Sequence, residues 1–340
     1  MSRTPLITEP QARYATIAAT LLALFLCLRL GLLGALLAGL LVHELVNAIA
    51  PHIPFGARGA KRARVLSVGL IGTLVIGALV AAGFGALELF RSEGASPAVL
   101  LARMADILSS SRASLPEWIG QYLPEDAEAL RQAIADWLRA HARELETAGR
   151  SFGVGVAHVL IGMVIGAIVC FREAYAEGDH TILLKEAGQR VLTLARAFRS
   201  VVFAQVKISA VNTTLTAIYL AVVLPLLGVH LPFTKAMIAV TFFAGLLPVV
   251  GNLISNSVIV VVSLSVSFAV ALGSLGFLVL VHKLEYFLNA RIVGGEIRAS
   301  AWEILCAMLV LEAAFGLPGL IAAPVFYAYV KAELRQLGLI

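Results

Sequence analysis

An apolar run at residues 303–334 places the tightest limit on how this chain can fold. Its composition suits a lipid bilayer, yet it is longer than the roughly 20 residues that one plain helical crossing needs. Gly316, Pro318 and Gly319 interrupt it near its middle, and Pro324 follows. The sequence therefore predicts a broken segment, either a kinked helix that crosses fully or two half-helices folded into a re-entrant hairpin.

A second over-long apolar run, at residues 236–264, is split in the same way by Pro248 and Gly251. Broken helices leave backbone groups free, and transporters use such groups to hold a solute near the bilayer midplane. Irregular backbone at that depth must line a cavity or be buried in protein. We expect the two breaks to face each other near the midplane.

Composition sets the class of protein. The chain has 340 residues, of which 60% are hydrophobic and 14% charged, whereas soluble proteins carry about 25% charged residues. We predict an all-α polytopic membrane protein with about eight membrane segments, two of them broken or re-entrant. The net charge of +5 fits basic cytoplasmic loops and requires no nucleic-acid partner. The three cysteines stand inside apolar runs and indicate neither a disulfide nor a metal site.

The order of segments predicts three regions. Residues 1–90 carry membrane helices near 14–28, from about 32 to 50, and 65–89. Residues 91–150 are polar, and residues 151–340 form a membrane core with helices near 152–171, 208–227 and 267–288. The loop before residue 65 holds four basic residues and no acidic one, so it and the N-terminus are predicted to be cytoplasmic. Those residues are Arg58, Lys61, Arg62 and Arg64.

Residues 91–150 are interpreted as an extracytoplasmic helical arm. Five large apolar residues between 127 and 148 recur at helical spacing and form one face: Leu130, Ile134, Trp137, Leu138 and Leu145. That face must pack on the membrane body, on the headgroup layer or on another subunit, and periodicity does not choose among them. A second amphipathic stripe, Val191, Leu194, Ala195 and Phe198, is expected to lie along the inner headgroups.

Two arginines decide between the topologies of the broken segments. If both segments cross fully, Arg291 and Arg298 lie outside, against the positive-inside rule. If both are re-entrant hairpins, these arginines become cytoplasmic together with Lys331 and Arg335. The hairpin version, with both termini cytoplasmic, is the prediction.

Glu312 is the sharpest candidate for a transport function, because an ionisable residue at membrane depth usually faces a cavity, a partner or a proton path. It is interpreted either as a proton or cation carrier, or as a neutral, hydrogen-bonded acid, or as an acid near the surface because the hairpin is shallow. Asn252, Ser255 and Asn256 follow the Pro248 break and predict solute contact or, for Asn252 above all, capping of the broken helix.

Polar groups on the fifth and seventh helices complete the predicted path. Asn212 and Gln205 mark the start of the fifth helix, where helix-to-helix hydrogen bonding is the expected role and path lining the alternative. Glu285 stands near the cytoplasmic end of the seventh segment, either paired with Arg291 or part of a gate.

The chain holds no Walker loop, no dinucleotide-binding loop and no nucleophile elbow. We therefore expect no enzyme activity, no cofactor and no metal site, and any uphill transport must draw on an ion gradient.

Three motifs taken together resemble a known family. They are Pro248-Val-Val-Gly251-Asn252, the stretch from Glu285 through Asn289-Ala-Arg291 to Gly294, and Phe315-Gly316-Leu-Pro318-Gly319 continuing to Pro324. With the paired N-terminal helices and the polar arm, they resemble the autoinducer-2 exporter family, also called PerM-type permeases. The resemblance implies a multi-pass secondary transporter or exporter of the bacterial inner membrane, for which autoinducer-2 export and sodium/proton antiport have both been proposed.

The functional prediction is a secondary membrane transporter of a small solute, coupled to a proton or sodium gradient and homo-oligomeric. Two alternatives stay open. The chain can be a non-transporting membrane scaffold whose arm binds an extracytoplasmic partner, or it can be a passive channel.

Overall fold

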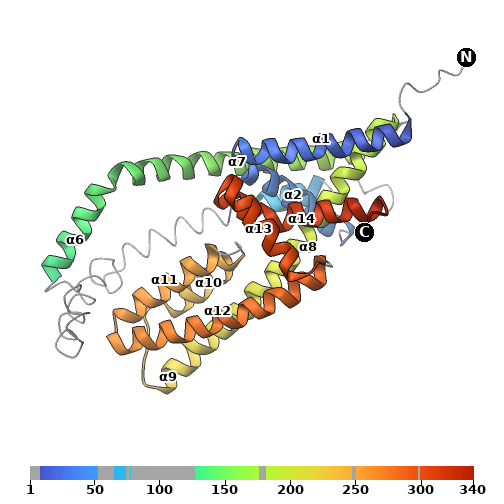
Figure 1. Ribbon diagram of the computed structural model, residues 1–340. Coiled ribbons are helices and arrows are strands. Elements are labelled where there is room, and N and C mark those ends of the chain that lie inside the picture. Colours follow the sequence, from blue (N-terminus) through green and yellow to red (C-terminus); the bar gives the residue numbers. More distant parts are fainter. Residues whose placement is uncertain are drawn as a thin grey trace, which may run out of the picture. The chain divides into compact units, whose positions relative to one another are not determined.

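The computed structural model describes residues 8–52, 65–73, 77, 127–175, 181–246, 250–297 and 299–340. Within these ranges the regular secondary structure is all helical: eleven α-helices, two short helical turns of other kinds, and a helical stretch at 65–73 (Figure 1). This confirms the all-α prediction for the described residues. The predicted helix at 65–89 is described only at 65–73 and 77, where 65–73 is helical.

The first two helices lie close to their predicted positions. Helix α1 spans Glu9–Arg29 and α2 spans Leu33–Ile49, continued by a 3₁₀ turn at Ala50–His52. The side chain of Gln11 accepts a hydrogen bond from the Thr8 amide at 3.1 Å and so supports the start of α1. Gly31 turns the chain between the helices at φ 69°, a backbone region that favours glycine.

Four helical stretches of the described chain are long and apolar enough to cross a membrane: Glu9–Arg29, Leu33–His52, Ala142–Cys170 and Ile182–Leu226. Shorter apolar helices accompany them at Thr234–Gly245, Gly251–Leu264 and Phe268–Leu284. This is the pattern of a multi-pass membrane protein.

The polar arm and the fourth membrane helix are joined. Helix α6 spans Ala127–Ala140, and after His141 helix α7 runs without interruption from Ala142 to Tyr175. The expected helix boundary near residue 150 is therefore absent. Gly149, Gly153 and Gly155 lower the helix propensity of this stretch but do not end the helix.

By its internal contacts the chain forms two compact units. The first unit comprises Met1–Gly77, Ser151–Phe203 and Val293–Ile340, and the second comprises Ala78–Arg150 and Ala204–Ile292. The predicted regions 1–90, 91–150 and 151–340 were defined by their position relative to the membrane, which internal contacts do not test. They stay predictions.

In the first unit, α2 and α7 touch through small residues. Ala35 and Gly39 on α2 meet Gly162 and Gly166 on α7, each pair separated by three residues. A β-carbon added at Gly162 would collide with the Ala35 backbone, and one at Gly166 with that of Gly39. This small-xxx-small pairing lets two membrane helices approach at backbone distance.

The first unit also buries the stripe that was expected to lie on the headgroups. Helix α8 spans Ile182–Ile218, and Leu194, Ala195 and Phe198 pack with residues of α1, α2, α13 and α14 in one apolar cluster. The headgroup interpretation is wrong for these three residues, while Val191 is exposed. An amphipathic stripe shows that one face is apolar but not whether lipid or protein covers it.

Helix α8 ends in an irregular turn. A π-helical turn at Tyr219–Val223 and a three-residue helix α9, Leu224–Leu226, follow it. The amide of Leu224 bonds to the Tyr219 carbonyl, five residues back. The wider turn accommodates Pro225, which has no amide of its own to donate.

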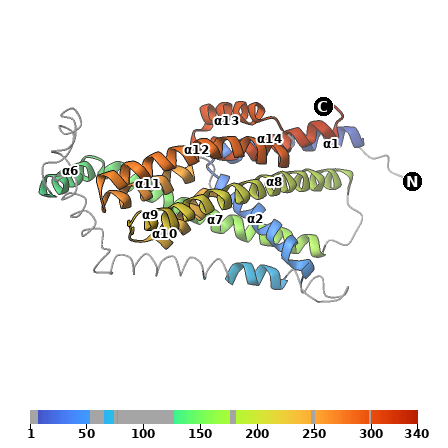
Figure 2. The same cartoon turned by 90° about the horizontal axis from the view of Figure 1, so that it is seen from below.

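Both predicted breaks are present, and at both the chain folds back on itself. Helix α10, Thr234–Gly245, is followed by α11, Val250–Leu264, and the two lie side by side (Figure 1). Met237 and Ile259, placed at similar distances on either side of the break, share one buried cluster. Helix α13, Ala301–Phe315, and α14, Leu317–Gln336, also lie side by side (Figure 2). Between the pairs, α12 spans Phe268–Ile297.

Candidate functional site

Four polar residues of α8, with Tyr219 at the start of the π-helical turn that continues it, share one face in the second unit: Gln205, Ser209, Asn212, Thr216 and Tyr219. Their spacing of 4, 3, 4 and 3 residues keeps them on one side of a helix. We name this row the α8 seam. Ser209, Asn212, Thr216 and Tyr219 are buried, so the seam faces protein.

The first two residues of the seam bind the C-terminal end of α10. The Gln205 side-chain amide donates a hydrogen bond to the Gly245 carbonyl at 2.7 Å, and the Ser209 hydroxyl donates to the Phe242 carbonyl at 2.6 Å. Both carbonyls belong to the last turn of α10, where no further helical amide is available to bond them. Side chains of α8 therefore satisfy backbone groups that the break sets free.

Residue 245 must be small for this contact. A β-carbon at Gly245 would stand 2.6 Å from the Ser209 hydroxyl oxygen. At the start of α11, a β-carbon at Gly251 would collide with the Ala244 backbone. The glycines on either side of the break thus allow α8, α10 and α11 to meet at backbone distance.

The seam continues onto α11. The side-chain amide of Asn212 donates to the side-chain oxygen of Asn252 at 3.1 Å, and both residues are buried. The Ser255 hydroxyl, also buried, donates to the Asn252 carbonyl at 3.4 Å. Helix-to-helix hydrogen bonding, the expected role of Asn212, is confirmed.

The seam then reaches α12 through a chain of hydroxyls. Tyr219 and Ser274 are 3.0 Å apart, and Ser274 and Ser263 are 2.8 Å apart. The Tyr219 ring also stacks on Phe277, with centroids 4.0 Å apart. Thr216, one turn before Tyr219, is 1% exposed, and its hydroxyl has no hydrogen-bond partner. A buried donor of this kind needs an explanation, such as a water, an ion or a ligand.

The structure brings together some of the predicted path residues and not others. Gln205, Asn212, Asn252 and Ser255 meet around the α10–α11 break. Asn256 lies on α11 and is half-buried. Pro248 and the side chain of Glu285 lie outside the described part of the chain.

Glu312 stands on α13 in the first unit, where it is exposed beside the exposed side chains of Leu309 and Val310. Since Gly251 and Gly316 belong to different units, the expected meeting of the two breaks stays a prediction.

The second break has a clear backbone cause. Gly316 adopts φ 65° and ψ −147°, a conformation that is nearly restricted to glycine. Pro318 stands at the second position of α14, where its missing amide is not needed. A β-carbon at Gly319 would collide with the Leu311 carbonyl, so the two helices touch directly beyond the turn. Pro324 is buried inside α14.

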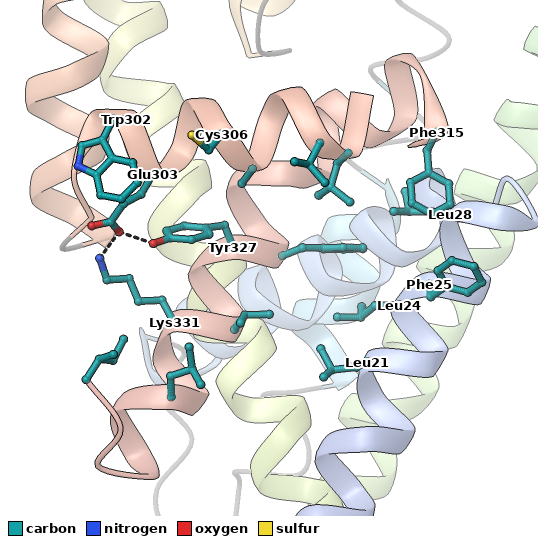
Figure 3. A pocket seen from close by; sticks show the side chains of 17 residues that line it. Leu21, Leu24, Phe25, Leu28, Trp302, Glu303, Cys306, Phe315, Tyr327 and Lys331 are labelled. Atoms are coloured by element: carbon teal, nitrogen blue, oxygen red, sulfur yellow. Dashed lines mark hydrogen bonds and ion pairs between the residues drawn. The ribbon is translucent and has the colours of Figure 1, made fainter. Parts of the chain in front are cut away.

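A polar clip closes the far end of this hairpin. Near the start of α13, the Glu303 carboxylate accepts hydrogen bonds from the Tyr327 hydroxyl and from the Lys331 ammonium of α14 (Figure 3). The Lys331 nitrogen also lies 5.7 Å from the Tyr327 ring centroid. Because residues 303 and 331 are nearly equidistant from Gly316, the clip holds the two helices antiparallel.

A buried ion pair in the first unit was missed by the sequence analysis. Arg190 of α8 is 1% exposed and donates to the Glu333 carboxylate of α14, which is 3% exposed. Arg190 also reaches the Glu186 carboxylate at 3.2 Å. The second oxygen of Glu333 and the hydroxyl of Tyr329 are buried without a hydrogen-bond partner.

The signal for this pair was present in helical spacing. Arg190 precedes Leu194 and Phe198 by four and eight residues, which places it on the same buried face. Glu333 follows Tyr329 and Phe326 in the same manner on α14. Reading the charged positions in the phase of the apolar stripe would have assigned both residues to the interior.

Polar contacts from α1 extend this cluster. The Arg13 guanidinium donates to the Gln336 carbonyl at 2.7 Å, and the Gln336 side chain donates to the Thr193 hydroxyl at 3.3 Å. Helices α1, α8 and α14 are therefore tied together by side-chain hydrogen bonds at the C-terminal end of α14.

Comparisons of the chain with protein-family models, with curated proteins and with solved structures found no match.

Proposed function

We propose that this chain is a secondary membrane transporter or exporter of a small solute, driven by a proton or sodium gradient across a bacterial inner membrane. The observation that carries the proposal is the α8 seam against the broken α10–α11 pair. It places hydrogen-bonding side chains and freed carbonyls within helices whose composition suits a membrane. The resemblance to the autoinducer-2 exporter family points the same way.

The proposal assigns about eight membrane segments, with α10–α11 and α13–α14 as re-entrant hairpins. Helices α10, α11 and α13 have 12, 15 and 15 residues, fewer than the roughly 20 that a crossing needs, while α14 has 20. Because the two helices of each pair lie side by side, a hairpin that dips into the bilayer and returns fits them better than a kinked crossing. Residues 91–150 form the extracytoplasmic arm, both termini are cytoplasmic, and the protein works as a homo-oligomer.

In this proposal the solute passes along the seam. A solute with hydrogen-bonding groups exchanges partners with Asn212, Asn252 and the carbonyls at the end of α10, because a polar group in a dry interior needs a replacement bond at every step. The unpartnered Thr216 hydroxyl offers one such bond. Glu312 remains the candidate coupling group.

Flux measurements test this function. The purified protein in proteoliposomes, with imposed proton or sodium gradients and a panel of labelled small polar solutes, should move at least one solute in a gradient-dependent way. Replacing both Asn212 and Asn252 with leucine should abolish that flux, since the seam loses its paired amides. Thr214→Val is the matched control, because Thr214 lies on the exposed face of the same helix and bonds only its own backbone.

Other results of these flux measurements indicate a different function. Flux that ignores the imposed gradient indicates a passive channel. Lack of flux for every solute, with partner binding lost on deletion of residues 94–143, indicates a scaffold. Glu312→Gln should abolish gradient-driven flux while the protein still folds, and unchanged flux removes Glu312 from the mechanism.

A further inference from the structure

A groove of about 820 Å³ runs in the first unit between α1 and the α13–α14 hairpin (Figure 3). Leu21, Leu24, Phe25 and Leu28 of α1 form one wall. The hairpin forms the other wall, and Phe315 at its turn packs edge-on against Phe25 with ring centroids 5.6 Å apart. The volume is in the range of ligand-binding cavities.

The groove is apolar along its length and polar at one end. The clip of Glu303, Tyr327 and Lys331 closes that end, beside Trp302, while Phe25, Leu28 and Phe315 surround the opposite end (Figure 3). An occupant that satisfies both ends must have a long apolar part and one polar group. A polar solute would leave its hydrogen bonds unmade over most of the groove.

The setting of the groove indicates which amphiphile reaches it. Its α1 wall belongs to a helix long and apolar enough to cross a membrane, and on that helix Leu21 and Phe25 are exposed. The medium against an exposed apolar face of a membrane helix is lipid hydrocarbon. Trp302 is 67% exposed at the polar end, as expected for an indole at headgroup level.

The Lys331 ammonium at the polar end has donors that a phosphate can use. An ammonium has three donors, and Glu303 accepts one from Lys331. A phosphate oxygen can accept another while Glu303 stays in place. Basic residues at the cytoplasmic headgroup level attract anionic lipids in this way.

We propose that this groove is a binding site for one phospholipid from the surrounding bilayer, with an acyl chain between α1 and the hairpin and the phosphate on Lys331. An acyl chain in the groove packs against both walls where they do not touch each other, and so it holds the hairpin against α1. The proposal rests on membrane insertion and is independent of transport.

Trp302 serves as the reporter. In a Trp118→Phe, Trp137→Phe background it is the one tryptophan left, since the chain has three. Quenching of its fluorescence by a minor fraction of brominated phosphatidylglycerol should exceed the quenching from random lipid contact and should saturate. Both lipids carry the phosphate, and only phosphatidylglycerol carries a net negative charge. The preference for phosphatidylglycerol over phosphatidylcholine should be less than about fivefold, the size of one unpaired lysine's attraction to an anionic headgroup, because Glu303 offsets part of the Lys331 charge.

Two substitutions at the polar end should have opposite effects on the lipid preference. Lys331→Gln should remove the preference for phosphatidylglycerol, and Glu303→Gln should raise it towards fivefold, because the competing carboxylate is gone. Ala307→Phe should fill the groove and reduce quenching to the random level. The matched control is Ala313→Phe, on the same helix but outside the groove lining, which should leave the excess quenching unchanged.

Quenching at the random level in the parent protein, or excess quenching that survives Ala307→Phe, overturns the proposal. So does protection of Trp302 from all lipids together with cross-linking of Cys306 between two copies, since a second chain would then occupy the groove. Cys306 is exposed and lines the groove, so it is available for that cross-link.

Discussion

Replacing Arg190 with methionine should lower the free energy of unfolding by about 3–5 kcal/mol, the cost of leaving one member of a buried ion pair without its partner. The side chain of Glu333 is 4% exposed and would keep a carboxylate away from water. Glu186, whose side chain is 19% exposed, can turn to solvent and adds little to the loss.

The structure also predicts which single variant loses more stability. Glu333→Gln should cost about half as much, because Arg190 keeps its contact with Glu186 at 3.2 Å. The double variant Arg190→Met, Glu333→Leu should return to within about 1 kcal/mol of the parent, since well-packed apolar side chains replace buried pairs at little net cost.

Equilibrium unfolding in mixed detergent micelles, followed by circular dichroism, measures these differences. Arg139→Met is the control, because the Arg139–Asp136 pair on α6 is 77% and 72% exposed and should change stability by less than about 0.5 kcal/mol. A loss below 1 kcal/mol for Arg190→Met, or equal losses for the two single variants, would refute the assignment of a buried, three-residue charge cluster.

Three further variants test the packing. Gly162→Ala should destabilise the protein by about 1–3 kcal/mol through collision with α2, whereas Gly155→Ala on the same helix, with open space around it, should be neutral or stabilising in the same unfolding assay. Gly316→Ala should cost about 1–3 kcal/mol from backbone strain alone, because nothing stands within 4 Å of its β-carbon position; an unchanged midpoint would mean that the turn relaxes. Exchanging Asn212 for leucine in the presence and absence of Asn252→Leu should reveal a coupling energy of about 0.6 kcal/mol, and additive losses would show that the two amides do not interact in the membrane.

Local sequence was enough to predict the all-helical class and both interruptions, although not the continuous helix across residue 150. Gly316, Pro318 and Gly319 predicted the interruption of the last apolar run, because glycine and proline disfavour a continuous helix. Apolar runs of spanning length predicted a membrane protein, and the four long apolar helices of the described chain agree. These features depend on residues close together in the chain, so spacing and composition suffice.

Which surfaces cover one another was decided by the tertiary structure. The stripe around Phe198 was correctly predicted as apolar, yet it packs on protein rather than headgroups. Arg190 received no role from the sequence, and its partner Glu333 comes to it on α14 from 143 residues away.

The α8 seam shows the same division. Helical spacing places Gln205 and Asn212 on one face. That spacing does not identify their acceptors, the carbonyl of Gly245 and the side-chain oxygen of Asn252, each 40 residues further along. A helical repeat determines which side of a helix a residue faces. The partner on that side depends on the packing of the remaining helices, which a one-dimensional pattern does not contain.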